Sequence, residues 1–530
     1  MDEKISTTYN DTNIQENQYE YNSYSSRTIS TLNIWGCNLL DTYKPETVKQ
    51  IVSDPMENNR ELRQLSQIVY NNNGIVTNTI DYMVALPTLD NVVICYGKDK
   101  KKSKFFKETT EKLLRKFKDK EFVRDAMLRL LVDGVAFYYF ETSAKSNDFK
   151  KYLSDYDVDR IVEINAAPNA SFVSLNPDCT RIVGIKNSSY ILAFDLNYFN
   201  DGTGESTEAK LRKYPKEIRE AYHQYATNNR ASNWFVLDNN HTVAVKFRAK
   251  KQEPWGRPLV LAALQDILFN DYFIDTKRNV LDEVNNRIYY QTFPEGEKKG
   301  KSALSTNQQR EQHNAVREGI MGKNNRGGVS FFSVAAGTKI DSLNTNIDLL
   351  DEKNESTLRS NISTSVGFAG SLLSGSGDSS FSSQEGNLRL VTAEIFNIIE
   401  LITYELNKVI NAFIGGDDNN SIEVYYLPIT HANRSDMVGF AKDLYLQGKG
   451  SLSLWAAASG IAPKAFFALL DEELELDIEE KYPVHQTSAT LSSKSADDDK
   501  GGRPQMDNPT NSNTIKSKTN NSNNVPKPKQ

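Results

Sequence analysis

The stretch from residue 254 to residue 413 constrains the fold most, because it holds three long helical segments in a fixed order. The first runs from Leu259 to about Arg287 and would be on the order of 45 Å long. An irregular insert follows, and a second helix is predicted from about Asp348 to Val366. A Gly/Ser-rich stretch then leads into a third helix, from about Leu388 to Phe413. Long helices with an insert at one end and a loop at the other favour the wall of a tube over an enzyme pocket.

The first of these helices carries a line of apolar residues that recurs every seven positions. The line and its two flanking residues are Val260, Leu264, Ile267, Ile274, Leu281, Val284 and Ile288. A sustained seven-residue repeat predicts a narrow seam along a neighbouring helix. The interpretation we favour is that copies of the chain pack side by side in a ring and cover this seam. The alternative is an ordinary core helix of a monomer.

Composition excludes several classes of protein. The chain has 530 residues and a formal net charge of −6, so a role in binding DNA would have to come from a local patch or from shape. Three widely separated cysteines predict neither a disulfide framework nor a zinc site, and favour reduced, buried thiols in an intracellular compartment. The polar first residues predict no secretory signal, and no apolar run approaches the ~20 residues of a membrane helix.

Helical and β-prone segments alternate on both sides of the long helices, which predicts a mixed α+β fold. Before them, helices are expected from Pro45 to about Ala85 and from Thr110 to Leu131, with strands at Val92–Tyr96 and Val135–Phe140. Residues 160 to 250 read as short strands around one helix that begins at Pro215. After the long helices, one strand at Ser421–Leu427 precedes several short helices that begin at Ser435.

A basic run from Lys98 to Lys107 contains the aromatic pair Phe105 and Phe106. The interpretation we favour is a solvated loop that leads into the following helix. The alternative is a patch that contacts phosphates, with an aromatic side chain available for stacking.

Catalytic and metal-binding patterns are not found in the sequence. The segment from Gly296 to Ser302 resembles a phosphate-binding loop, but it has three residues between its glycines where that loop needs four. We therefore predict a basic hairpin with Lys298, Lys299 and Lys301 facing solvent. The five histidines are scattered without metal-ligand spacing. We expect no enzymatic activity, no catalytic residue, no metal and no cofactor.

Four features stand out in the order of elements from about residue 45 to 480. They are a strand pair in an α+β segment, a helix preceded by a Trp-Gly-Arg-Pro sequence, an insert followed by a second helix and a Gly/Ser loop, and a Phe-Ser-Ser sequence that opens a long helix before a group of short helices. Their residues are Phe172–Leu175 with Arg181–Ile185, Trp255–Pro258, residues 288–385, and Phe381–Leu388 with the segment from Ser435. In these features and their order the chain resembles the portal (head-to-tail connector) proteins of tailed bacteriophages, particularly of phages with long non-contractile tails.

The resemblance implies a portal fold that divides the chain into named parts. They are a disordered N-terminal arm (1–30), an α+β wing (31–253), a stem helix (254–287), a small α/β clip (288–346), a second stem helix (347–366), a tunnel loop (367–385), the long wing helix with a strand (386–433), a helical crown (434–485) and a disordered tail (486–530).

It also implies a function. Portal proteins form a ring, usually a dodecamer, at one capsid vertex, through which double-stranded DNA is packaged by a separate terminase and later ejected. The expected partners are further copies of the chain, DNA, the terminase, the major capsid and scaffolding proteins, and the head-tail adaptor, with no membrane. The expected location is the head-tail junction of the virion, after assembly in the host cytoplasm.

Three groups of residues are implied to carry this function. The tunnel loop would place Gly367, Phe368, Leu372, Leu373, Ser374, Gly375, Ser376, Gly377 and Phe381 near the DNA. The candidates for the channel wall are Lys277, Arg278 and Arg287. The clip would present Lys298, Lys299, Lys301, Arg310 and Arg317 to the terminase and then to the adaptor.

Two other classes of function remain open at this point. A packaging enzyme that acts on nucleic acid would need a phosphate-binding loop or clustered carboxylates. A non-viral scaffold or adaptor would assemble through the same long helices without a channel for DNA.

Overall fold

The computed structural model describes residues 45–142, 170–200, 207–212, 214–227, 232–285, 289–298, 301–321, 334–342, 352–368, 381–417 and 420–482. The chain divides into two compact units, one ending at Ala462 and one beginning at Pro463. Within the described residues, the second unit consists of α18 (Pro463–Glu475) and α19 (Ile478–Lys481). The remaining elements belong to the first unit.

The main core of the first unit is built from helices that surround a long central helix. Leu62, Leu65, Met127 and Leu131 are almost completely buried in it, together with the apolar side of α15. Its helices are α3 (Pro45–Ser53), α4 (Asn59–Asn72), α5 (Gly74–Ala85), α6 (Lys100–Phe117), α7 (Asp119–Asp133) and α15 (Phe381–Ile414).

Two strands from opposite ends of the first unit form one sheet. β1 (Asn91–Gly97) pairs antiparallel with β10 (Asn420–Tyr426), from Asn91 opposite Tyr426 to Gly97 opposite Asn420. Their alternating pattern places Val93, Ile422 and Val424 in the main core, as expected for strands with one buried face. The pairing therefore closes a loop of more than three hundred residues.

Two asparagines of α15 complete the hydrogen bonding of β10. The Asn407 amide donates to the Val424 carbonyl at 3.1 Å and its oxygen accepts from the Val424 N–H at 2.8 Å. Asn411 makes the same pair of bonds with Ile422, at 2.7 and 2.8 Å. Asn407 and Asn411 are one helical turn apart and lie on the same side of α15, and their partners Val424 and Ile422 are two residues apart and lie on the same side of β10. Their side chains thus satisfy backbone groups that an exposed strand edge would leave unpaired.

A three-stranded sheet separates the main core from a second core. Its order is β3 (Ala170–Ser174), β2 (Val135–Thr142), β7 (Thr242–Lys246), and both pairings are antiparallel. Along β2, Ala136, Tyr138 and Phe140 lie in the main core, whereas Val135, Phe137 and Tyr139 lie in the second. A strand covered on both faces explains why this stretch of the sequence is apolar without alternation.

The second core is covered by a further sheet and two helices. The sheet has the order β4 (Thr180–Lys186), β5 (Ser189–Asp195), β6 (Trp234–Val236), and the helices are α9 (Thr207–Arg212) and α10 (Lys216–Thr227), with a 3-10 turn, η2, at Leu196–Asn200. Phe194, Phe199 and Tyr214 form an aromatic cluster at its centre, with ring centroids 5.1 to 5.8 Å apart.

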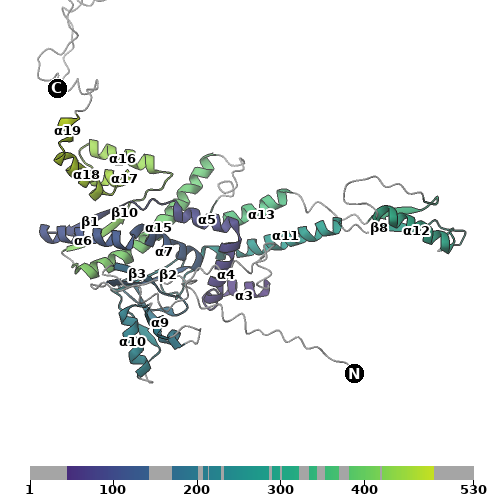
Figure 1. The fold of residues 1–530 in the computed structure, drawn as a ribbon, viewed down its shortest axis with the longest axis horizontal. Coiled ribbons are helices and arrows are strands. Elements are labelled where there is room, and N and C mark those ends of the chain that lie inside the picture. The colour runs from purple at the N-terminus through teal and green to yellow at the C-terminus, as the bar shows by residue number, and fades with distance from the viewer. Residues whose placement is uncertain are drawn as a thin grey trace, which may run out of the picture. The chain divides into compact units, whose positions relative to one another are not determined.

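The long helical stretch folds into a helix pair with a separate module between its members. A 3-10 turn, η3 (Leu259–Ala263), leads into α11 (Leu264–Asn285), and α13 (Glu352–Ser365) packs beside α11 (Figure 1). The chain between them forms α12 (Thr306–Met321) and the antiparallel pair β8 (Tyr289–Thr292) and β9 (Lys339–Ser342).

The last helices of the first unit pack at the end of β10. α16 (Arg434–Leu446) and α17 (Leu452–Ala458) contact one another, and Ala441, Ala457 and Ala458 form a small third core with Leu427 and Ile429. No single helix in the described ranges is long and apolar enough to cross a membrane, although α17 and α18 pass that test of length and composition when taken together as a bent pair.

The mixed α+β class is as predicted, and several elements lie where the sequence indicated. β1, β2, β10 and α10 coincide with predicted segments. Cys179 is a buried free thiol, as expected, whereas Cys95 is a free thiol that is only partly buried, and Cys37 lies outside the described residues. The terminal arm (1–30) and tail (486–530) also lie outside them.

Four local predictions were wrong. The helix predicted at Thr110–Leu131 is two helices that meet at Lys118, whose backbone is left-handed with φ 54°. The basic run is not a loop, because α6 begins at Lys100, where Asp99 caps it by accepting from the N–H groups of Lys101 and Lys102. The supposed strand pair belongs to different sheets, β3 beside β2 and β4 beside β5. The long helix begins at Phe381, so residues 381–385 are not part of a loop.

Replacing Asn407 or Asn411 by alanine should destabilise the first unit. Each change leaves a backbone N–H and a C=O of β10 without partners, at a cost of about 1–3 kcal/mol, which exceeds the gain in helix propensity of up to about 0.7 kcal/mol. The apparent Tm in thermal unfolding should fall for Asn407→Ala and Asn411→Ala. The matched control is Asn397→Ala, at an exposed position of the same helix, where the Tm should hold or rise. Equal Tm values for all three variants would refute the role assigned to the two amides.

Candidate functional site

The approach to α11 is fixed by two glycines in direct contact. A Cβ atom on Gly256 would lie 1.9 Å from the carbonyl oxygen of Gly134, and Gly134 has φ 78°, so neither position tolerates a side chain. The Phe247 N–H donates to the Gly134 carbonyl at 2.8 Å, and the Arg257 N–H donates to the Phe247 carbonyl at 2.8 Å. The chain therefore leaves the β3–β2–β7 sheet and turns toward α11 at the Trp-Gly-Arg-Pro sequence.

Charged side chains hold this turn in place. Arg257 makes two hydrogen bonds to the Glu253 carboxylate, at 2.6 and 2.9 Å, and these bonds lower the pKa of Glu253 to about 2. The buried Lys246 ammonium donates to the carbonyls of Lys250, Lys251 and Glu253, and burial lowers its pKa. A lysine that satisfies three carbonyl oxygens fixes the path of residues 250–253 immediately before the helix.

The helix pair is joined by polar contacts toward both ends of α13. The Lys277 ammonium lies 2.9 Å from the Glu355 carboxylate, and Ser365 donates to Asp266 at 2.5 Å. Glu355 also pairs with Arg359. The pKa of Glu355 is lowered, mainly by the hydrogen bond from Lys277. Lys277, predicted as a channel-wall residue, thus makes an ion pair between α11 and α13. Arg278 is about half exposed and lies 3.4 Å from Asp275 on its own helix, and the side chain of Arg287 lies outside the described residues.

The heptad seam of α11 was wrongly assigned to a neighbouring subunit over its first half. Val260, Leu264 and Ile267 are buried in the main core of their own chain. The side chains of Leu281, Val284 and Ile288 lie outside the described residues, so the second half of the seam stays a prediction. Over the part of α11 whose side chains are described, the large exposed apolar side chains are instead Phe269 (57%) and Tyr272 (63%). These two are one turn apart, on a side of α11 away from the core residues and from Lys277.

Part of the predicted tunnel loop belongs to the core. Phe368 is 6% exposed and packs in the main core, held by a turn in which the Gly367 N–H donates to Thr364 and the Phe368 N–H donates to Ser363. Gly367 itself is exposed with φ 96°. Phe368 is therefore not an exposed loop tip, and Phe381 is the first residue of α15. The other predicted loop residues lie outside the described part of the chain: Leu372, Leu373, Ser374, Gly375, Ser376 and Gly377.

The insert between the two helices presents cations to solvent. Lys298, Lys301, Arg310 and Arg317 are exposed, and Lys299 lies outside the described residues. The Gly296 N–H donates to the Lys301 carbonyl at 2.7 Å, and the Ala303 N–H donates to the Pro294 carbonyl at 2.9 Å. These bonds form the predicted hairpin, whose residues 299 and 300 lie outside the described part of the chain.

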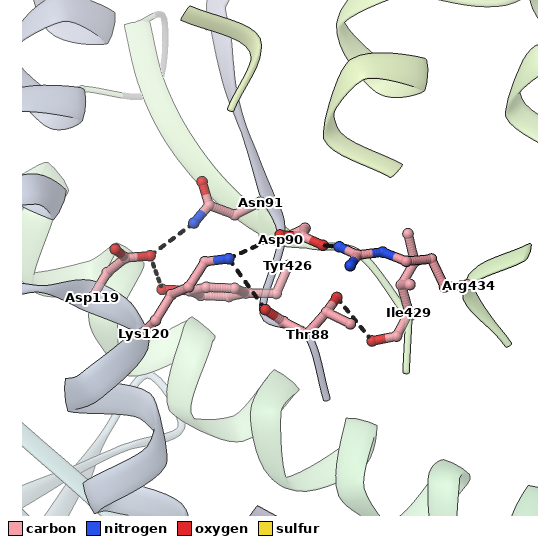
Figure 2. Close-up of polar contacts among 8 residues, drawn as sticks. All are labelled: Thr88, Asp90, Asn91, Asp119, Lys120, Tyr426, Ile429 and Arg434. Atoms are coloured by element: carbon pink, nitrogen blue, oxygen red, sulfur yellow. Dashed lines mark hydrogen bonds and ion pairs between the residues drawn. The ribbon is translucent and has the colours of Figure 1, made fainter. Parts of the chain in front are cut away.

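A polar cluster that the sequence did not reveal ties four elements together (Figure 2). Asp90, at the start of β1, pairs with Arg434 at the start of α16 and, at 2.8 Å, with Lys120 near the start of α7. Lys120 also donates to the Thr88 carbonyl at 3.2 Å, and the Thr88 hydroxyl donates to the Ile429 carbonyl at 3.2 Å. One network thereby holds together the ends of β1 and β10, α7 and α16.

A buried branch of the cluster centres on Asp119. Its carboxylate accepts from Asn91 at 2.7 Å and from the Tyr426 hydroxyl at 3.1 Å. Burial raises the pKa of Asp119, and burial next to this carboxylate raises the pKa of Tyr426 well above its usual range. Because Asp90 and Arg434 are 344 positions apart, no local sequence signal could have indicated the contact.

Comparison with known proteins gives one sequence relative and several structural ones. No protein-family profile matches the chain. The SPbeta prophage-derived uncharacterized protein YonE of Bacillus subtilis (strain 168) is 23% identical over 541 residues, covering 98% of this chain and 99% of the relative. The neck of a native gene transfer agent particle is 11% identical with a TM-score of 0.42, covering 79% of this chain and 95% of that one. A HK97-family phage portal protein from Corynebacterium diphtheriae is 9% identical with a TM-score of 0.29, covering 68% and 94%.

Within the described ranges, no three His, Cys, Asp or Glu side chains gather as they would around a metal ion. Of the predicted residues that the structure describes, Phe368 lies in the core, Lys277 and Arg278 lie on α11, and the clip cations lie on the exposed insert.

The raised pKa of Asp119 predicts how stability depends on pH. Because the folded state binds the Asp119 proton more tightly than the unfolded state, protonation of Asp119 contributes to stability. This contribution is fully present below the unfolded-state pKa, near 3.8, and is lost as pH rises through the folded-state pKa. Asp119→Asn keeps an oxygen for Asn91 and Tyr426 and removes the buried charge. Its apparent Tm relative to the wild type should therefore increase between pH 4 and pH 7. Asp436→Asn, at an exposed position, reports the background. A relative Tm that is flat or falls with pH would contradict this assignment.

Proposed function

We propose that this chain is a phage portal protein that forms a ring at a capsid vertex and passes double-stranded DNA through its centre. The observation that carries the proposal is the course of the chain from residue 254 to 414. α11 leaves the central body, a separate β8–α12–β9 module follows, and α13 returns beside α11 before the long helix α15 crosses the core. In portal proteins, which the sequence resembles, a stem helix, a clip, a second stem helix and a wing helix follow one another in this order. The likeness of the chain to a prophage-derived protein over nearly its whole length supports a viral origin.

The proposed ring uses the surface of α11 that its own chain leaves uncovered. Phe269 and Tyr272 expose large aromatic area, and a neighbouring copy that covers them would remove it from water. The ion pair between Lys277 and Glu355 and the bond from Ser365 to Asp266 hold α11 and α13 side by side, in antiparallel orientation, as a two-helix wall. Long non-contractile tails and a dodecameric copy number remain predictions from the resemblance.

In this proposal the insert is the docking site for other proteins. The exposed Lys298, Lys301, Arg310 and Arg317 would meet the terminase during packaging and the head-tail adaptor afterwards. The capsid and scaffolding proteins would contact the outer parts of the ring in the virion. The net charge of −6 suits a channel through which DNA must slide, because each extra phosphate contact would add affinity and salt dependence. We propose no catalytic step and no cofactor.

The mass of the purified protein tests this function. Native mass spectrometry and electron-microscopy averages viewed along the ring axis should show a closed ring with a central opening. A stable monomer that turns over nucleotide would overturn the proposal in favour of a packaging enzyme. Assembly without a central opening would favour a scaffold.

Replacing both exposed aromatics of α11 should weaken the ring. The double change Phe269→Ser and Tyr272→Ser removes the apolar area that we assign to the subunit interface, so the ring should give way to smaller species in mass spectrometry. Tyr82→Ser, at a comparably exposed aromatic of α5, is the control and should leave the ring intact. A ring unaffected by the double change would show that α11 does not form the interface.

Deleting residues 370–379 tests the tunnel loop. The ring should still assemble, because both stem helices are retained, while DNA packaging or retention should fall. Packaging assays of the deletion in its own phage or prophage background measure this. Normal packaging would remove the assignment of the loop without affecting the assignment of the ring.

A further inference from the structure

One helix of the first unit concentrates positive charge in an acidic protein. Between Lys98 and Lys118 the chain has ten lysines and arginines and three aspartates and glutamates, a net charge of +7 in a chain of −6. Almost all of this segment is α6, which begins at Lys100. The charge is therefore ordered along a helix, and it is not spread over a loop.

The buried side of α6 fixes which residues face solvent. Phe106, Thr110, Leu113 and Leu114 are buried, and α6 packs against β1, β3 and β10. With 3.6 residues per turn, the opposite side carries Lys101, Lys104, Lys112 and Arg115. All four are exposed, and so are the cations that flank them: Lys100, Lys102, Lys107 and Lys116.

The lysines in the first turns of α6 do not stabilise the helix that carries them. Among the described residues, no carboxylate lies within ion-pair distance of Lys100, Lys101, Lys104 or Lys112. Lys100, Lys101 and Lys102 occupy the first turn, where the helix dipole disfavours positive charge, and no acidic residue lies there. Lysines four apart, such as Lys100 and Lys104, also repel each other. An arrangement that is locally unfavourable and solvent-exposed points to an anionic partner.

The chemistry of the surface selects among polyanions. Lysine is depleted in protein–protein interfaces, and the large apolar side chain that α6 exposes is a single aromatic, Phe105 (63%). One aromatic is too few for the stacking platform that single strands need. The apolar side of α6 is buried, so the helix cannot insert into a membrane surface. Duplex DNA presents closely spaced negative charge, and binding to it requires neither several exposed aromatic side chains nor an exposed apolar helix face.

The length of the helix also fits a duplex. Eighteen residues span about 27 Å, and phosphates follow one another at ~3.4 Å along the axis of each strand, so α6 lies beside about eight base pairs. Lysines bind phosphates as point charges and lack the bidentate geometry by which arginine reads guanine. Contacts of this kind position the backbone and carry no sequence information.

We propose that the exposed face of α6 binds the phosphate backbone of duplex DNA without sequence preference. In Figure 1, α6 lies at an end of the first unit away from α11 and α13. The surface is thus distinct from the channel proposed above, and it would hold DNA outside that channel. The inference does not depend on ring formation, because it rests on the charge and exposure of one helix.

The test compares two variants of the full-length protein that lose the same charge. The first changes Lys100, Lys101, Lys104 and Lys112 to glutamine. The control makes the same change at four exposed lysines on other helices and turns: Lys49, Lys216, Lys442 and Lys449. Binding to a mixed-sequence duplex of about thirty base pairs is followed by fluorescence anisotropy between 50 and 200 mM salt. Vesicles of phosphatidylserine and phosphatidylcholine provide a second, non-nucleic probe.

The α6 variant should bind the duplex at least about tenfold more weakly at 50 mM salt, and the slope of log K against log salt should fall by about three to four, near 0.9 for each lost phosphate contact. The control should lose less than about threefold, and a duplex of different sequence should bind the wild type equally well. Equal losses in both variants, no duplex binding by the wild type at 50 mM salt, or binding to vesicles alone would each overturn the proposal. A ring that fails to assemble while α6 still binds DNA would count against the proposed function and leave this inference standing.

Discussion

The antiparallel pairing of β1 with β10 is the contact on which the rest of the first unit depends. It brings Asn91 opposite Tyr426, and every element between these strands must leave from and return to the same place. Closing so long a loop costs conformational entropy, and the pairing is accordingly reinforced on two sides. Asn407 and Asn411 of α15 bond the backbone of β10, and the Asp90 and Asp119 contacts bind the ends of both strands to α7 and α16 (Figure 2).

Two parts of the first unit are built on the β1–β10 pairing. One is the pair of cores divided by β2, whose alternate residues serve the main core on one face and the second core on the other. The other is the α11–α13 pair, which is attached to the main core through Val260 and Ile267 and oriented by the contact between Gly134 and Gly256. In the ring that we propose, copies would pack through this helix pair and the inserted module would remain available to other proteins.

The charged residues fall into two populations with different physical roles. Lys246, Lys277 and Lys408 are partly or fully buried, and each is satisfied by carbonyls or a carboxylate, so they fix elements to one another. Burial lowers the pKa of Lys408, as it does for Lys246, which is the expected cost of holding such a group inside. The lysines of α6 are exposed and make no such contacts among the described residues. A net charge averaged over the chain conceals this division.

The sequence by itself determined the class of the fold and most of its elements, because helical and strand periodicity are local properties. Local patterns predicted the strands at residues 91–97, 135–142 and 420–426, the helix around residues 264–285, and the hairpin at Gly296. It did not determine partners. Val260 and Ile267 face their own core, Phe368 is buried, Lys277 pairs with Glu355, and the β1–β10 sheet joins residues far apart in the chain. Only the tertiary structure decides such matters, because burial and ion pairing depend on which segments meet in space, and an apolar repeat or a lysine looks the same in sequence whichever neighbour it has.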